Sequence, residues 1–384
     1  MPLKEITAGI VGVGFIGVAH AEALRRIGVR VGGVVGSSPE RTRAKAEQAG
    51  LPHVHDSFEA LLADPDIDVV HIASPNNLHV GQAHAALEAG KHVVCEKPLG
   101  LSTEETAGLR RAAEASGLVH AVCLNLRFYP LCHEMRAMVA ADALGEPRLV
   151  TGSYLQDWML EDTDWNWRID TREGGPLRAV ADIGSHWLDL AAFITGRRVV
   201  EVLADLHTFL PVRRRPSRSV ETFATASADE ELVEEPISSD DAASMLLRFE
   251  GGARGALTVS QVSAGRKNAV NLEVDGASSA VAWFSEDPDR LWIGHRGRPN
   301  EVLQRDATLM GPEAAALARY PGGHVEGYPD TFRGLFEAVY ADVRRGAPAA
   351  EPAYPTFADG HDVVAVTEAV ARSAEDGRWT TVER

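Results

Sequence analysis

The sequence predicts an α/β fold in two parts: an N-terminal Rossmann domain, then an α+β domain with a large, mainly antiparallel open sheet. The first 125 residues alternate short β-rich apolar runs with segments of helical period, which is typical of a parallel sheet covered by helices. After Tyr129, longer β-rich runs are joined by hairpin turns. The length of 384 residues is sufficient for two or three domains.

Six strands are expected in the first domain, residues 1–125, and the helices between them have recognisable ends. Ser38 offers an N-cap, Pro39 fits the first helical position and Gly50 ends that helix. Ser102 and Glu105 have the spacing of a capping box at the start of a later helix. The six strands are placed at residues 6–11, 29–35, near 54, 69–72, 92–94 and 119–124.

The second domain, residues 126–384, is expected to contain hairpins and late helices. Two glycine-containing turns, at residues 250–252 and 275–276, lie between β-rich runs, which is a strong hairpin signal. Because few helices are available to cover the second face of this sheet, we expect a homo-oligomer, either a dimer or a tetramer. The flanking strands are 245–249, 256–262, 272–274 and 280–284, with alternating Leu246, Leu257, Val259, Leu272 and Val274; helices follow at 330–343 and 357–374, and a closing strand at 379–382.

Residues 212–241 are expected to form a solvated surface loop. The segment begins with a run of arginines at 213–215 and continues with paired glutamates at 230–231 and 234–235. It has little apolar periodicity, which is typical of an irregular insertion.

Composition and charge exclude several classes of function. The 38 Lys and Arg against 55 Asp and Glu give a net charge of −17, which disfavours binding to nucleic acid or an anionic membrane. No apolar run approaches the roughly 20 residues that span a bilayer, and the first residues lack the apolar segment of a signal peptide. Cys95, Cys123 and Cys132 have no CxxC spacing, which is typical of reduced thiols, so we expect a cytoplasmic protein.

A glycine-rich turn follows the first predicted strand directly and opens a helical segment. In dinucleotide-binding folds the first glycine permits the tight turn, the second lets the backbone approach the pyrophosphate, and the third lets helix and strand pack. The helix N-terminus adds a positive potential. The residues expected to bind the dinucleotide here are Gly12, Gly14, Phe15, Ile16 and Gly17.

The end of the second predicted strand favours NADP over NAD. An acidic residue at this point usually binds the ribose 2′-hydroxyl of NAD, and the strand tip has none. The hydroxyls of Ser37 and Ser38 and the guanidinium of Arg41 suit a 2′-phosphate. Two alternatives stay open: Arg41 is simply exposed on a surface helix, or Glu40 turns toward the ribose of NAD.

Two loops leave the fourth and fifth predicted strands at the carboxyl edge of the sheet, where open α/β sheets bind ligands. Ser74, Asn76 and His79 lie in the first loop and are candidates for cofactor binding. Glu96 and Lys97 lie in the second loop, before a proline that fixes the backbone. The Lys97 ammonium is a candidate to donate a hydrogen bond to a substrate oxygen, and the alternative is a solvated surface charge.

Asp182 and His186 begin a predicted helix that ends at Gly196, and a spacing of four residues places them on one helical face. The structural alternative is a carboxylate that stabilises the helix start and a histidine satisfied in the interior. A metal site is not expected, because no third ligand stands at suitable spacing and His53 and His55 belong to the short strand near residue 54.

Together these motifs carry a resemblance to a known family. The GxGxxG turn at 12–17, the triplet Glu96-Lys97-Pro98 and Asp182-x-x-x-His186 resemble, in this order, the glucose-fructose oxidoreductase / inositol dehydrogenase / MocA (Gfo/Idh/MocA) family, and the match runs over essentially the whole chain. The segment 152–158, followed by the pattern Trp-x-Trp-Arg at 165–168, looks most like the levoglucosan dehydrogenase-like sugar dehydrogenases within that family.

The resemblance implies reversible hydride transfer between a ring carbinol of a sugar, cyclitol or glycoside and NADP or NAD. In this reading His186 is the general acid/base, Lys97 hydrogen-bonds the reacting oxygen and Asp182 orients the substrate. The second domain supplies the sheet against which the sugar rests and through which subunits pair. The expected substrate-binding residues are Lys97, Asn125, Arg127, Tyr154, Trp165, Arg168, Asp182 and His186.

Two departures from the family pattern bear on these expectations. The acidic residue at the end of the second strand is missing, and Asn125-Leu126-Arg127 replaces a more usual Asn-Tyr-Arg. Two other functions stay open: a glycoside-cleaving enzyme that uses bound NAD transiently, and a non-catalytic dinucleotide-binding sensor. The presence of Lys97, Asp182 and His186 argues against the sensor.

Overall fold

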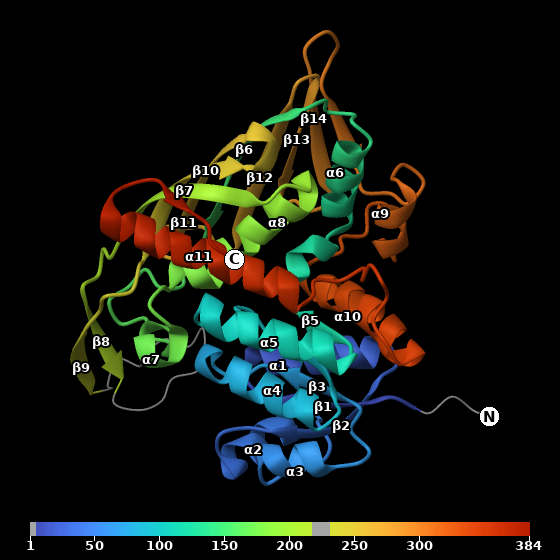
Figure 1. Cartoon of the computed structure of the whole chain (residues 1–384), viewed down its shortest axis with the longest axis vertical. Helices are drawn as coiled ribbons and strands as arrows, with labels where there is room; N and C mark the ends of the chain where they lie inside the picture. The colour runs from blue at the N-terminus through green and yellow to red at the C-terminus, as the bar shows by residue number, and fades with distance from the viewer. Residues whose placement is uncertain (1–4, 217–230) are drawn as a thin grey trace. The chain divides into compact units, whose positions relative to one another are not determined.

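The structure, a computed structural model that describes residues 5–216 and 231–384, forms two compact units (Figure 1). The first comprises Met1–Asn125 and Pro329–Val364, and the second Leu126–Tyr328 and Ala365–Arg384. Residues 329–364 follow the second sheet in sequence, yet they pack with the first unit. Phe357 contributes to the apolar core of that unit.

The first unit contains the expected parallel sheet, with strand order β2-β1-β3-β4-β5. The predicted short strand near residue 54 is wrong: this segment forms only an isolated bridge, Val34 to Val54. Since α3 begins at Phe58, the chain turns away after this single pairing. The strands are β1 (Thr7–Val11), β2 (Arg30–Val35), β3 (Val69–Ile72), β4 (His92–Cys95) and β5 (His120–Val122).

The helices of the first unit have the ends that the sequence predicts. The Ser102 hydroxyl accepts the Glu105 N–H at 3.2 Å, which is one half of the predicted capping box, whereas the Glu105 carboxylate accepts the Leu101 N–H at 3.1 Å. Gly117 closes the same helix in the left-handed conformation. Ser38 is the N-cap of α2, although its side chain makes no capping hydrogen bond. The helices are α1 (Phe15–Arg26), α2 (Pro39–Gln48), α3 (Phe58–Ala63), η1 (Asn76–Leu78), α4 (His79–Glu88), α5 (Thr103–Ser116) and α10 (Tyr328–Arg345).

The second unit is built on a nine-stranded sheet with the order β15-β14-β13-β12-β6-β11-β10-β7-β16. The predicted hairpins β10–β11 and β12–β13 are both present, although the second turn lies at residues 277–278, just after the predicted position. Among the described strands of this sheet, β6 and β11 form the one parallel pair. The strands are β6 (Pro147–Leu155), β7 (Val199–His207), β10 (Ala242–Phe249), β11 (Arg254–Ser260), β12 (Ala269–Gly276), β13 (Ser279–Phe284), β14 (Arg290–His295), β15 (Glu301–Gln304) and β16 (Thr380–Thr381).

One face of this sheet is covered by helices, among which α6 and α8 pack on β6, β12 and β13 (Figure 1). Trp187 of α8 anchors the layer, because it is fully buried and its Nε1 donates to the Asn271 carbonyl at 2.8 Å. The helices are η2 (Asn125–Phe128), α6 (Pro130–Ala140), η3 (Trp167–Ile169), α7 (Thr171–Gly174), η4 (Val180–Gly184), α8 (Ser185–Thr195), η5 (Glu250–Gly252), α9 (Pro312–Leu317) and α11 (Phe357–Asp376), whose first residues lie in the first unit.

The expectation of an irregular loop at residues 212–241 is wrong at its two ends. Strands β8 (Val212–Pro216) and β9 (Leu232–Pro236) pair as an antiparallel ribbon that places Arg214 opposite Glu234. Arg213 is fully buried rather than solvated. Arg215 pairs with Glu235 across the ribbon at 2.9 Å, whereas Arg213 and Arg214 pair with Asp241 and Asp162 outside it. Apolar periodicity does not reveal such pairs. The middle of the predicted loop, including Glu230, lies outside the described residues.

No helix in residues 5–216 or 231–384 combines the length and apolar character that crossing a membrane requires.

Candidate active site

The turn between β1 and α1 has the geometry that a dinucleotide pyrophosphate needs. Gly12 has a φ of +97°, and a Cβ there would lie 2.3 Å from a carbonyl oxygen of the loop after β3. A Cβ on Gly17 would lie 2.0 Å from the Gly12 carbonyl oxygen. A Cβ on Gly14 would meet nothing within 4 Å, so a ligand can approach the backbone there. Phe15 and Ile16 form the first turn of α1, whose N–H groups can hold a phosphate.

The residues beyond β2 present polar groups to solvent. Ser37 and Arg41 are exposed, and Ser38 is half-buried at the start of α2. These groups are therefore available to a ribose or a 2′-phosphate.

His79 joins the two loops at the carboxyl edge of the first sheet. Its Nδ1 lies 2.7 Å from the Pro98 carbonyl oxygen and its Nε2 lies 2.9 Å from the Ser74 carbonyl oxygen. Burial lowers the pKa of His79, so the ring is neutral and donates to one of the two. The Ser74 hydroxyl donates to Gln82 at 2.6 Å, and Asn76 is buried at the start of the same loop. These contacts fix the loop shape against which a cofactor would bind.

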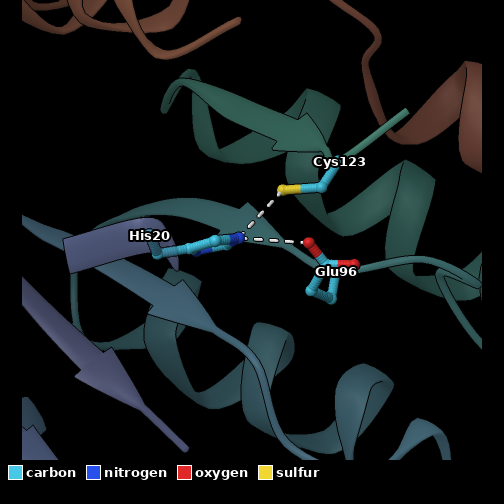
Figure 2. Close-up of side chains that lie close together, drawn as sticks. All are labelled: His20, Glu96 and Cys123. Carbon is cyan, nitrogen blue, oxygen red and sulfur yellow. Dashed lines mark hydrogen bonds and ion pairs between the residues drawn. The ribbon is translucent and has the colours of Figure 1, made fainter. Parts of the chain in front are cut away.

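Glu96 and Lys97 directly follow β4; Glu96 is buried and Lys97 is half-buried. One Glu96 carboxylate oxygen accepts the Lys97 backbone N–H at 3.2 Å, and the other lies 3.1 Å from His20 Nε2 (Figure 2). The thiol of Cys123 lies 3.7 Å from the same nitrogen. Glu96 therefore joins the backbone of Lys97 to a buried polar cluster.

Asp182 is the centre of a polar network in the second unit. Its Oδ1 lies 3.2 Å from Arg168 Nε, and its Oδ2 accepts a hydrogen bond from Gln261 Nε2 at 2.8 Å. Arg168 is itself held by Asn166, whose Oδ1 accepts at 3.1 Å, and by the ring of Trp167, 4.4 Å away. The carboxylate of Asp182 is therefore fixed in direction beside a cation.

His186 lies in the first turn of α8 and is 7% exposed. The predicted start of this helix needs correction, because Asp182 lies in a π-helical turn, η4, rather than in an α-helix. The Ser185 hydroxyl donates to the Ala181 carbonyl at 2.7 Å and satisfies an acceptor in this turn. A π-helical turn is frequent at functional sites.

Tyr154 lies beside His186, with ring centroids 6.5 Å apart. Its hydroxyl donates to Asn268 at 2.7 Å, and burial together with the Asp182 charge raises the pKa of Tyr154 well above its usual range. Tyr154 therefore stays protonated, and Asn268 accepts the hydrogen bond from its hydroxyl. Trp165, also predicted from the sequence, is half-buried in the segment before η3.

Asn125 and Arg127 make contacts of a structural kind. The Asn125 amide donates to the Thr331 hydroxyl at 2.7 Å within the first unit. Arg127 Nε donates to the buried Asp189 of α8 at 2.8 Å, and its guanidinium lies over the Phe193 ring. Arg127 therefore stabilises the helix that carries His186.

A buried ionic cluster that the sequence did not reveal stabilises the start of η4. The Asp240 carboxylate accepts the Arg178 N–H at 2.6 Å and the Val180 N–H at 2.9 Å. Asp241 is ion-paired with both Arg178 and Arg213, all with fully buried side chains. In the sequence, the signal for this cluster is the pair of adjacent aspartates at 240–241. They stand at the end of the predicted surface loop, residues 212–241.

The structure thus gathers the predicted residues into two groups. The glycine turn, Ser74, His79, Glu96 and Lys97 belong to the carboxyl edge of the first unit. Tyr154, Trp165, Arg168, Asp182 and His186 belong to the second unit, where Asp182 contacts Arg168 and Tyr154 neighbours His186.

The glycine turn on a parallel sheet defines the class of the protein as an NAD(P)-binding oxidoreductase. Residues 6–123 match the family model described as "Oxidoreductase family, NAD-binding Rossmann fold", and residues 132–281 match "GFO/IDH/MocA C-terminal domain". The chain belongs to the Gfo/Idh/MocA oxidoreductase family, which confirms the predicted family and fold class.

The chain is similar over its whole length to proteins of known structure. Levoglucosan dehydrogenase of Pseudarthrobacter phenanthrenivorans is 28% identical, with 99% of each chain covered. A solved levoglucosan dehydrogenase complex with NADH and L-sorbose has a TM-score of 0.87 at 27% identity, covering 99% of each chain. An inositol dehydrogenase homolog from Azotobacter vinelandii, solved with NADH and myo-inositol, has a TM-score of 0.83 at 27% identity, covering 98% of each chain. Both structures hold NADH and give no support to a preference for NADP.

Proposed function

We propose that this protein is an NAD(P)-dependent dehydrogenase that oxidises a ring carbinol of a neutral sugar, cyclitol or glycoside. The observation that carries the proposal is the network around Asp182, which fixes a carboxylate four residues before His186. Such a pair can hold two hydroxyls of one ring, one for proton transfer and one for orientation. Relatives named for levoglucosan and inositol support this substrate class.

The proposed roles follow from the chemistry of each side chain. His186 takes the proton from the reacting hydroxyl, since an imidazole titrates near neutral pH. Lys97 donates a hydrogen bond to the same oxygen, and Asp182 accepts one from a second hydroxyl. Gly12, Gly14 and Gly17 leave room for the pyrophosphate of the dinucleotide. The nicotinamide, when bound, supplies the hydride acceptor.

A neutral substrate is favoured because the nearby arginines are already paired. Arg168 lies against Asp182, and Arg172 makes a forked contact with Asp170. A substrate carboxylate or phosphate would have to displace one of these carboxylates. Turnover confined to acidic or phosphorylated sugars would contradict this part of the proposal.

The test is a panel of sugars, cyclitols and glycosides with both cofactors, monitored at the absorbance of the reduced nicotinamide. His186→Ala and Lys97→Ala are expected to lower kcat about 10²- to 10⁴-fold while the dinucleotide still binds. Asp182→Asn is expected to raise KM and lower kcat. A His186→Ala protein that keeps turnover within a few-fold of the parent would contradict the mechanism, and release of an aglycone without accumulation of reduced cofactor would favour glycoside cleavage.

We also propose that NADP(H) binds at least as tightly as NAD(H). The exposed hydroxyl of Ser37 and the exposed guanidinium of Arg41 support this, as does the lack of an acidic residue at the tip of β2. Arg41→Ala is expected to weaken NADPH binding about tenfold and to leave NADH binding unchanged. Equal effects on both cofactors would reject the assignment.

Finally, we propose that the open face of the nine-stranded sheet pairs two subunits. The sequence predicts five alternating apolar residues in this sheet. Leu246 is 49% exposed on the open face. The other four are buried under the helices: Leu257, Val259, Leu272 and Val274. Leu203 and Ala256 lie beside Leu246 in register and line a hollow there. Light scattering should show a dimer or tetramer that Leu246→Asp dissociates, and a monomeric parent at micromolar concentration would reject the proposal.

A further inference from the structure

Four polar side chains form a continuous line through the interior of the first unit. Tyr340 Oη lies 2.9 Å from His71 Nε2, and His71 Nδ1 lies 3.1 Å from His20 Nδ1. His20 Nε2 then lies 3.1 Å from a Glu96 carboxylate oxygen (Figure 2). The four residues come from α10, β3, α1 and the end of β4, so only the tertiary structure connects them.

The line is closed to solvent. His20, His71 and Tyr340 are fully buried, and Glu96 is 7% exposed. The Phe336 ring packs 4.9 Å from the His20 ring and 4.8 Å from the His71 ring, measured between centroids. In such surroundings every donor must meet an acceptor, because an unmet polar group carries the full cost of desolvation.

The protons can be assigned by following donors along the line. Burial raises the pKa of Tyr340 and lowers that of His71, so the phenol keeps its proton and the His71 ring is neutral with one N–H. Within the described residues, 5–216 and 231–384, His71 Nε2 is the sole hydrogen-bond partner of the Tyr340 hydroxyl. The hydroxyl therefore donates to Nε2, which leaves the His71 proton on Nδ1.

We propose that Tyr340, His71 and His20 form a one-directional hydrogen-bond relay that ends on the Glu96 carboxylate. His71 Nδ1–H donates to His20 Nδ1, and His20 Nε2–H donates to Glu96. Each ring thus has one donor and one acceptor, and both are used. The relay holds one oxygen of the Glu96 carboxylate while the Lys97 N–H holds the other.

The same atoms suggest a competing arrangement. His20 Nε2, the Cys123 sulfur and a Glu96 oxygen all lie within 4.8 Å of one another, a spacing that suits a transition-metal ion. A metal needs an unprotonated Nε2 and a thiolate. The relay places a proton on Nε2, and burial with the Glu96 charge raises the pKa of the Cys123 thiol. The relay and a metal are mutually exclusive, so one measurement separates them.

The direct test is nitrogen NMR of the full chain labelled with ¹⁵N-histidine, with His20→Gln and His71→Gln used for assignment. We expect protonated Nε2 and bare Nδ1 in His20, and the reverse in His71. Tyr340→Phe should change the ¹⁵N chemical shifts of His20, although Tyr340 does not contact that ring. The control is Tyr354→Phe, which should leave these chemical shifts unchanged because the Tyr354 hydroxyl donates to Asp342. A proton on His20 Nδ1, two protons on either ring, or stoichiometric zinc that Cys123→Ser removes would overturn the relay.

A second test concerns the effect of the relay on catalysis, and this test rests on the proposed function. Since Lys97 is given a role at the reacting oxygen, His20 acts as a positioning residue through Glu96. His20→Leu is expected to lower kcat about 10- to 100-fold. His20→Gln, which keeps a donor toward Glu96, should restore most of this loss, and His120→Asn, a buried histidine outside the relay, should leave kcat unchanged.

Equal kcat in His20→Leu and the parent would overturn the positioning role. If no sugar is turned over at all, the proposed function fails while the NMR result still decides the relay.

Discussion

The carboxyl edge of the first unit and the polar centre of the second unit are prepared for ligands by different means. At the edge, Gly12 and Gly17 shape the backbone itself, and a side chain on either would collide with a carbonyl oxygen. At the polar centre, Asp182 is fixed by side chains 14 positions before and 79 positions after it, Arg168 and Gln261. A site made of backbone can be recognised from local spacing, whereas a site made of side chains depends on distant segments.

The largest effect is expected where the backbone site tolerates no side chain. Gly12→Val places a branched Cβ at a positive φ and against a carbonyl oxygen, so we expect the unfolding free energy to fall by about 5 kcal/mol. Gly14→Ala is the matched control, because its Cβ meets open space. It should keep the stability and weaken only dinucleotide binding, as denaturant unfolding and cofactor titration would show. A stable Gly12→Val protein would contradict this account of the turn.

The next effect tests the buried ionic cluster that stabilises the start of η4 in the second unit. Asp241→Asn removes the charge that neutralises two fully buried arginines, Arg178 and Arg213, and should destabilise the protein by about 3 to 5 kcal/mol. Asp162→Asn is the control, because Asp162 pairs with the neighbouring Arg214 on the surface. It should change the denaturation midpoint little, since exposed pairs contribute little. Equal losses in both variants would show that the buried cluster has no special weight.

A smaller effect concerns pH. Burial raises the pKa of Asp240 from 3.8 to about 6, although two backbone N–H groups oppose the shift. The folded state therefore binds this proton more tightly than the unfolded state, and stability falls as pH rises from about 4 to about 6, by about 3 kcal/mol at most.

Asp240→Asn should remove this component from a pH series of denaturation curves, whereas Asp205→Asn, at an exposed position, should not. Parallel pH curves for the parent and Asp240→Asn would contradict the prediction.

The smallest effect concerns a helix end in the first unit. Ser102→Ala removes the hydroxyl that accepts the Glu105 N–H and should cost about 1 kcal/mol. Ser38 occupies the same N-cap position in α2 but makes no such hydrogen bond, so Ser38→Ala should cost less in the same unfolding assay. A larger loss of unfolding free energy in Ser38→Ala than in Ser102→Ala would show that the capping hydrogen bond does not decide the contribution of an N-cap residue to stability.

Prediction succeeded where the signal was local. The parallel strands, both hairpins, the Ser102 cap and the glycine turn were all found, because each depends on residues a few positions apart. It failed at residue 54, where a β-rich segment forms a single bridge instead of a strand. It also failed at the β8–β9 ribbon, because charged residues that pair across strands resemble a solvated loop.

The sequence by itself determined the class of the first unit and the residue types of the site. Gly12 must be glycine because of its own φ, and the four-residue spacing of Asp182 and His186 holds whether the turn is α or π. Only the tertiary structure decided which groups hold these residues. Gln261 meets Asp182, Asp240 anchors the chain before it, and Tyr340 reaches His71 across 269 positions. Hydrogen bonds and ion pairs act over a few ångströms, so they depend on where the fold places two residues and leave no periodicity in the sequence.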